Sequence, residues 1–220
     1  LILASSIALA LAACGGSDND DMQTPAPAPA PPVMTAGDVF AITVSNKLIS
    51  FNRDTPTTTR TSVTVSGLQA AETLLGIDFR PADGQLYAVG SSGRIYTINT
   101  TSGAATLKST LAADATDTTL PFTALAGTDF GVDFNPVADR LRVVSNTGQS
   151  LRINVDSGAT TTDGAINGGA ANTITASAYT NSFAGTASTT LYALDATNDT
   201  LYVQNPPNNG TLSLPIALGV

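Results

Sequence analysis

Two aspartates stand in matching sequence frames and are the first candidates for chemistry. Asp78 lies in Gly-Ile-Asp-Phe (76–79) and Asp133 in Gly-Val-Asp-Phe (131–134), each with a proline shortly after. Two carboxylates that face one another can hold Ca²⁺ or form the acid–base pair of a glycoside hydrolase. The alternative is structural: each Asp caps a turn or accepts a backbone amide, and recurs because the sequence repeats. Catalytic pairs need unlike environments, so the matching frames favour the structural alternative.

A small group of arginines is the second candidate site. Arg140 and Arg142 point to the same face of a predicted strand because side chains alternate with a period of two. Together with Arg152 they could clamp the carboxylate or sulfate of a ligand. The alternative is a solvated face of ion pairs with Asp139 or Asp133. We keep Asp78, Asp133, Arg140 and Arg142 as the predicted ligand-binding residues.

Two further segments resemble binding loops only superficially. Asp114, Asp117 and Asp129 flank a long insertion (112–128), but the residue pattern of a calcium-binding loop is missing. The glycine-rich segment Asp163–Ala171 has no Lys and no following helix, so it is not a phosphate-binding loop. We therefore predict a solvated loop and a turn. We predict no resident cofactor or metal site, and Ca²⁺ is the one ion left open.

Composition excludes several classes of chemistry. The 220 residues contain no His, no Trp and a single Cys, so a Ser-His-Asp triad, a Cys-His pair and a zinc site of His or Cys are ruled out. Acid–base work would fall to carboxylates, Lys or Tyr. With 9 basic and 17 acidic residues the net charge is −8, which argues against a nucleic-acid partner.

These candidates lie within a pattern that repeats along the chain. Each copy has a short apolar strand, a turn rich in Gly, Asn or Ser, and a second strand, as expected for a hairpin. The strand pairs are 39–42 with 47–52, 86–89 with 94–99, 141–144 with 149–154, and 191–194 with 200–204. Arg142 occupies a position that is aromatic in the other copies, which carry Phe40, Tyr87 and Tyr192.

The repeats predict an all-β fold. Two copies add an earlier Gly-x-Asp-Phe strand and a later strand after Ser-Gly, which gives about four strands per unit. A four-stranded unit that returns every 47–55 residues is typical of a β-propeller blade. A β-sandwich is the alternative, although nothing in a sandwich requires successive units to look alike.

The N-terminal segment predicts export. Residues 1–13 form an apolar run that ends in small residues, too short to span a bilayer and typical of a signal peptide, here truncated. Leu-Ala-Ala-Cys (11–14) resembles the lipobox of bacterial lipoproteins. This resemblance implies that Cys14 carries the acyl chains of a membrane anchor. The alternative is an ordinary secretory signal or a buried segment in which Cys14 is incidental. By analogy with lipoproteins of enteric bacteria, Gly15 in place of Asp favours the outer over the inner membrane.

The segment after Cys14 is expected to be a tether. Residues 15–37 show no apolar period and contain five prolines between 25 and 32. Such a segment forms a disordered, semi-rigid spacer of about 3 Å per residue. We therefore divide the chain into a signal (1–14), a tether (15–37) and a β domain (38–220). Because no Gly-x-Asp-Phe strand precedes Val39, we expect an incomplete first unit, unpaired strand edges and further sequence beyond Val220.

Four phrases of the β domain resemble a bacterial family, the domain of unknown function 4394. They are Gly-Leu-Gln-Ala-Ala-Glu-Thr-Leu-Leu-Gly-Ile-Asp-Phe-Arg-Pro (67–81), Arg-Val-Val-Ser-Asn-Thr-Gly-Gln (142–149), Ala-Tyr-Thr-Asn-Ser-Phe-Ala-Gly (178–185) and Gln-Asn-Pro-Pro-Asn-Asn-Gly-Thr-Leu (204–212). The resemblance covers residues 38–220 and implies a propeller of repeats without an assigned activity.

We therefore expect a lipid-anchored binding or scaffold module of the cell envelope, with a protein or carbohydrate ligand. The rival hypothesis is an enzyme, either a carboxylate-based hydrolase or a quinoprotein-like propeller with a bound quinone. Fold analogy alone is a weak basis for an activity.

Overall fold

The computed structural model describes residues 35–219. The chain divides into two units, Leu1–Val33 and Met34–Val220, and the structural description concerns the second. Cys14, the predicted signal (1–14) and residues 15–34 of the predicted tether lie outside the described residues.

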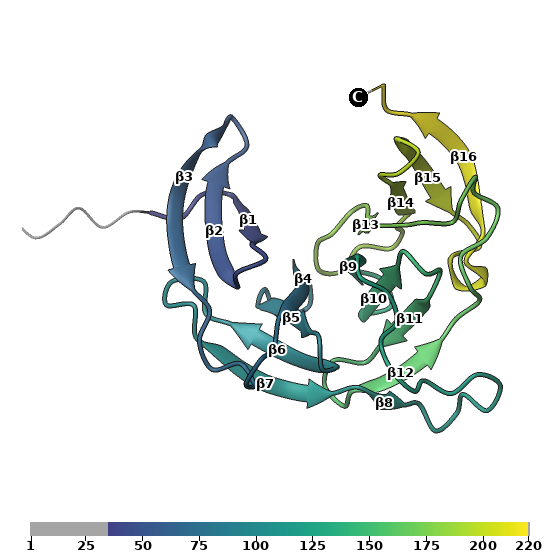
Figure 1. The fold of residues 1–220 in the computed structure, drawn as a ribbon, viewed down its shortest axis with the longest axis horizontal. Coiled ribbons are helices and arrows are strands. Elements are labelled where there is room, and N and C mark those ends of the chain that lie inside the picture. The colour runs from purple at the N-terminus through teal and green to yellow at the C-terminus, as the bar shows by residue number, and fades with distance from the viewer. Residues whose placement is uncertain (1–34, 220) are drawn as a thin grey trace, which may run out of the picture. The chain divides into compact units, whose positions relative to one another are not determined.

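The fold is all-β, with four small antiparallel sheets arranged as the blades of a β-propeller (Figure 1). This confirms the predicted propeller over the β-sandwich. The one helical turn in the described part is the 3₁₀ helix η1 (Pro207–Asn209). No helix within residues 35–219 is both long and apolar enough to cross a membrane.

Three of the sheets share the same strand order from the inner to the outer edge. The first sheet contains β1 (Val39–Ile42), β2 (Lys47–Asn52) and β3 (Thr55–Thr64), and the second contains β4 (Leu74–Phe79), β5 (Leu86–Gly90), β6 (Arg94–Ile98) and β7 (Ala105–Thr110). The third contains β9 (Phe130–Asn135), β10 (Arg140–Ser145), β11 (Ser150–Ile153), β12 (Ala159–Thr162) and the short β8 (Ala112–Ala113), and the fourth contains β13 (Ala176–Tyr179), β14 (Leu191–Asp195), β15 (Thr200–Gln204) and β16 (Leu212–Ala217).

The inner strands bring the sheets together. β4 contacts β9, and β9 contacts β13, so the Gly-x-Asp-Phe strands of the second and third sheets lie next to one another (Figure 1). In the first sheet β1 and β2 correspond to β5 and β6. This sheet therefore has three strands in the described residues, as the sequence predicts for the first unit.

The outer strands are linked by short parallel pairings. Ser66, which follows β3, bridges Ala104, which directly precedes β7. β8, which follows β7 in the chain, pairs in parallel with β12 of the third sheet, and Asn167 bridges Thr211. The segment that follows each of the first three sheets therefore pairs with the outer edge of the next sheet.

Apolar side chains fill the space between successive sheets in three clusters. The cluster between the second and third sheets is the largest and includes Tyr87, Ile95, Phe134 and Leu141, all at most 1% exposed. Tyr87 and Phe134 meet edge to face at 5.3 Å between ring centroids. Burial of apolar area between blades is thus the main stabilising contribution.

Glycines of the inner strands permit this close approach. A Cβ at Gly131 would lie 2.5 Å from the backbone nitrogen of Ser177, and one at Gly76 would lie 2.5 Å from Cγ2 of Val132.

We expect Gly131→Ala to lower the free energy of unfolding by about 1–3 kcal/mol, because β9 and β13 must move apart. Gly76→Ala should cost less, since a side chain can adjust where backbone cannot. Urea unfolding of both variants measures the difference, and a Gly131→Ala protein as stable as wild type would contradict the close approach.

Candidate functional site

The structure places Asp78 and Asp133 at equivalent positions on two inner strands. Oδ2 of Asp78 accepts the backbone N–H of Phe134 on β9 at 2.8 Å, and Oδ2 of Asp133 accepts that of Tyr179 on β13 at 2.6 Å. Each aspartate therefore joins its sheet to the next one. This is the structural role that the repeat suggests. The Gly of each frame lets the neighbouring inner strand come close, and the Asp accepts a backbone N–H of that strand.

The two carboxyl groups also influence each other. Burial, followed by the negative charge of Asp78, raises the pKa of Asp133 to about 8. Burial is also the main reason why the pKa of Asp78 lies above its usual value. One carboxyl of the pair therefore keeps its proton at neutral pH, and such a pair can in principle act as acid and base.

Arg142 is buried between the third and fourth sheets, with 1% of its surface exposed. Nη1 donates to Asp163 at 2.5 Å and to Ser150 Oγ at 3.1 Å, and Nη2 donates to Asn208 Oδ1 at 2.9 Å. Nε donates to the hydroxyl of Tyr179 at 3.3 Å. The guanidinium thus has partners on all three nitrogens, and Asp163, which sequence reasoning assigned to a turn, supplies the charge.

The structure separates the arginines that the sequence grouped. The guanidinium of Arg140 donates to the backbone carbonyls of Ala138 and Asp139 on the partly exposed side of the sheet. Arg152 is closer to Arg142, because Nε donates to the same carboxylate of Asp163 at 2.7 Å. Arg142 and Arg152 therefore share one counter-ion, while Arg140 lies apart from them.

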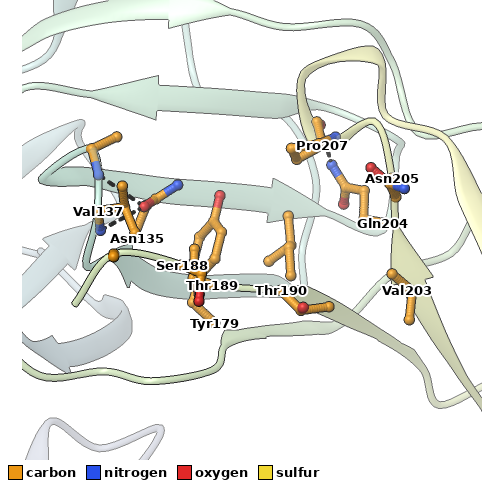
Figure 2. Close-up of a pocket in the computed structure, with 13 residues that line it drawn as sticks. Asn135, Val137, Tyr179, Ser188, Thr189, Thr190, Val203, Gln204, Asn205 and Pro207 are labelled. Atoms are coloured by element: carbon orange, nitrogen blue, oxygen red, sulfur yellow. Dashed lines mark hydrogen bonds between the residues drawn. The ribbon is translucent and has the colours of Figure 1, made fainter.

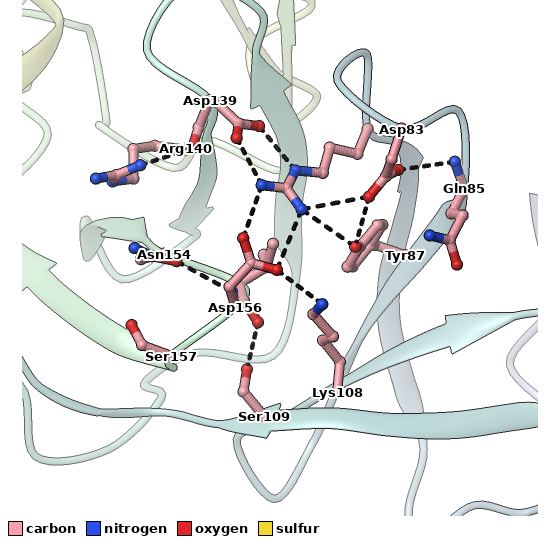
Figure 3. A network of polar contacts seen from close by, with 12 residues as sticks. Asp83, Gln85, Tyr87, Lys108, Ser109, Asp139, Arg140, Asn154, Asp156 and Ser157 are labelled. Carbon is pink, nitrogen blue, oxygen red and sulfur yellow. Dashed lines mark hydrogen bonds and ion pairs between the residues drawn. The ribbon is translucent and has the colours of Figure 1, made fainter.

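A second buried arginine, Arg80, was not found from the sequence. It follows β4 and makes a two-point contact with Asp139, with Nε at 2.8 Å and Nη2 at 2.5 Å, and a further contact with Asp156 at 2.9 Å (Figure 3). Tyr87 lies under the guanidinium. Hydrogen bonds from Arg80 and Lys108 lower the pKa of Asp156 to about 2. Because these carboxylates belong to the third sheet, this network ties it to the second.

A cavity of about 530 Å³ opens between the third and fourth sheets (Figure 2). This volume lies within the range of small-molecule sites. The walls come from the β9–β10 turn, the β13–β14 loop and the end of β15. The polar lining residues are Asn135, Tyr179, Ser188, Thr189, Thr190, Gln204 and Asn205. None of the lining side chains is charged.

Sequence reasoning missed Tyr179 and Gln204, although both break the repeat. Tyr179 occupies the position on the inner strand that Phe79 and Phe134 occupy in the second and third sheets. Each of the three pairs with the leucine that stands at the same place on the next strand: Phe79 with Leu86, Phe134 with Leu141, and Tyr179 with Leu191. Comparison of equivalent positions across the copies, which singled out Arg142, could have found both residues.

The acidic segment between β8 and β9 makes local contacts. Asp114 binds Thr116, and Asp117 accepts the backbone N–H groups of Leu120 and Thr162. Within residues 35–219, no group of three or more Asp, Glu, His or Cys side chains is arranged to hold a metal ion.

The sequence matches one family model, described as "Domain of unknown function (DUF4394)", over residues 47–220. No curated protein matches the chain.

Several solved structures are similar in part. A protein of unknown function from Bacteroides thetaiotaomicron VPI-5482 is 18% identical with a TM-score of 0.44, covering 81% of this chain and 42% of that one. BBS1N, solved in complex with ARL6DN, is 13% identical with a TM-score of 0.39, covering 82% and 50%. BamB from Moraxella catarrhalis is 13% identical with a TM-score of 0.36, covering 80% and 44%. This chain spans about half the length of these structures.

Proposed function

Because the chain belongs to the DUF4394 family, whose description names no activity, we propose a function from its own residues: a binding module held at the bacterial cell envelope. The lipid anchor would be Cys14, residues 15–37 would carry the domain away from the membrane, and the cavity beside β15 would receive the ligand. The proposed location is the outer membrane, because Gly15 and not Asp follows Cys14.

One observation carries the binding role. The side chains that line the cavity are neutral, whereas buried charges of the described domain are paired with opposite charges, Arg80 with Asp139 and Arg142 with Asp163. A neutral cavity between rigid strands supports recognition of a ligand, because it offers hydrogen bonds and apolar contact. Ionisable groups that already stabilise the fold are poorly suited to move protons during a reaction.

The second candidate is a hydrolase that uses Asp78 and Asp133. The shared proton of this pair favours it, since a protonated carboxyl beside a carboxylate is the usual starting state for acid–base catalysis. Against it, each aspartate already holds the backbone amide of the neighbouring strand. We therefore place binding first.

Lipid attachment is tested by Cys14→Ser in the exported protein. We expect wild type to incorporate labelled palmitate and to sediment with membranes, and the variant to lose both properties because the thioether cannot form. Ser17→Ala, three residues away, is the control and should behave as wild type. A variant that stays in the membrane fraction, together with an unlabelled wild type, would refute the anchor.

The binding role is tested by a thermal-shift screen of the full-length protein. The screen should include Ca²⁺, oligosaccharides, short peptides and quinones. A ligand of the native state raises the melting temperature by mass action, so at least one class should stabilise the protein without being converted. Conversion of an added substrate that stops in Asp133→Asn would instead establish the hydrolase.

A further inference from the structure

The cavity between the third and fourth sheets is lined by two residues that break the repeat in the same direction. Tyr179 stands where Phe79 and Phe134 stand in the other copies. Gln204 stands where Ile98 and Ile153 stand. The backbone fixes this second match, because Asn205 bonds to Thr211 as Asn99 bonds to Ala104 and Asn154 to Ala159. Each departure adds a polar group at a position that is apolar elsewhere.

The added group of Gln204 is not satisfied by the protein. Its side-chain Nε2 donates to the carbonyl of Pro207 at 2.7 Å, and the residue is 1% exposed. Oε1 lies on the opposite side of the amide (Figure 2) and has no hydrogen-bond partner in the described structure. A buried acceptor without a donor is unfavourable, so a bound group that supplies the donor gains affinity.

The added group of Tyr179 offers the complementary half. Its hydroxyl accepts a hydrogen bond from Arg142 Nε at 3.3 Å, which leaves the phenolic proton free to donate. Within residues 35–219, this hydroxyl donates to no protein acceptor. The adjacent guanidinium charge strengthens the phenol as a donor. Two residues that line the cavity therefore carry an unused acceptor and an unused donor.

We propose that this cavity is a carbohydrate-binding site in which sugar hydroxyl groups donate to Gln204 Oε1 and accept from the Tyr179 hydroxyl. This inference rests on the proposed binding function and names its ligand class. Hydroxyl groups suit the site because each can serve as donor or acceptor, so neighbouring hydroxyls of one sugar can meet both needs. Oε1 is itself buried, so the sugar hydroxyl reaches it only when side chains around Gln204 move.

The remaining walls fit a neutral sugar better than other ligands. Ser188 and Thr190 present hydroxyl groups at the rim, and Val137, Leu191 and Val203 add apolar contact. Since no lining side chain is charged, nothing in the wall would neutralise a phosphate or a carboxylate. The argument therefore favours uncharged polyhydroxylated compounds.

The test uses saturation-transfer NMR on the full-length protein with maltose, cellobiose, lactose and N,N′-diacetylchitobiose. Glucuronate and trialanine are the charged and peptide comparators. Two variants restore the residues of the other copies, Gln204→Ile and Tyr179→Phe, and both should fold because the repeat already accommodates these side chains. The control is Gln85→Ile, which changes an exposed glutamine before β5.

We expect at least one neutral disaccharide to bind, with its Kd raised about tenfold or more in Gln204→Ile and Tyr179→Phe and unchanged in Gln85→Ile. A melting temperature of Gln204→Ile close to wild type would show that the loss is local, since Tyr179→Phe also removes the acceptor of Arg142 Nε. Absence of binding by all four disaccharides, or binding that both site variants preserve, would overturn the inference. If trialanine or a ligand of the thermal-shift screen other than an oligosaccharide binds instead, the sugar site is wrong and the binding function stands.

Discussion

Arg142→Met is expected to lower the free energy of unfolding by about 3–5 kcal/mol, the largest effect of a single substitution predicted for this domain. The variant removes a buried cation that meets Asp163, Ser150, Asn208 and Tyr179. Methionine fills the volume but leaves these groups without their donor. Asp163 keeps Arg152 as a partner, which places the effect at the lower end of that range. Urea unfolding of wild type and variant measures this loss of stability.

Two comparisons separate the buried pair from general effects of charge. Arg140→Met removes an arginine whose guanidinium contacts backbone carbonyls of the β9–β10 turn, and we expect a change below about 1 kcal/mol. In a double-mutant cycle with Asp163→Asn, the combined loss should be smaller than the sum, because the second change removes the carboxylate that the first leaves poorly paired. Equal losses in Arg142→Met and Arg140→Met would show that the network contributes nothing specific.

The fold could be predicted because one structural unit repeats. Alternating strands and turn residues are local signals, and their return at a fixed interval indicates blades without any knowledge of distant contacts. The Gly-x-Asp-Phe frame also contains the residues that join one sheet to the next. Gly131 permits the approach of β13, and Asp133 binds the amide of Tyr179. The sequence shows that this frame recurs, but only the neighbouring sheet shows what it binds.

The site was harder to predict because its residues come from different repeats. Asp163 and Asn208 lie on opposite sides of a sheet junction, and nothing in the chain indicates that both reach Arg142. Arg80 likewise finds Asp139 and Asp156 across a junction. Ion pairs between distant residues leave no pattern in the sequence. A residue that departs from the repeat can be recognised in the sequence, as Arg142, Tyr179 and Gln204 show.

The proton shared by Asp78 and Asp133 should make the protein less stable as the pH rises. In the folded state Asp133 releases its proton with a pKa of about 8, and in the unfolded chain near the ordinary value of about 4. Between these values the folded state binds more protons than the unfolded state. The stabilisation is therefore complete below about pH 4 and is lost progressively until about pH 8. Carboxylates with lowered pKa, such as Asp156, titrate below this window.

Asp133→Asn should remove this dependence and stabilise the domain above pH 7. The asparagine oxygen can still accept the N–H of Tyr179, and its amide nitrogen can donate to the carboxylate of Asp78, so the junction of β9 and β13 keeps its hydrogen bonds without a buried proton. We expect a nearly equal stability of the two proteins at pH 5, and a gain that grows by about 1.4 kcal/mol for each pH unit between pH 5 and pH 7. Urea unfolding at pH 5, 7 and 8.5 measures the stability of both proteins.

The control is Asp54→Asn, which changes an exposed residue in the β2–β3 turn and should leave the dependence of stability on pH unchanged. If Asp133→Asn is destabilised equally at every pH, the carboxylate is needed for the strand junction and does not hold a proton there.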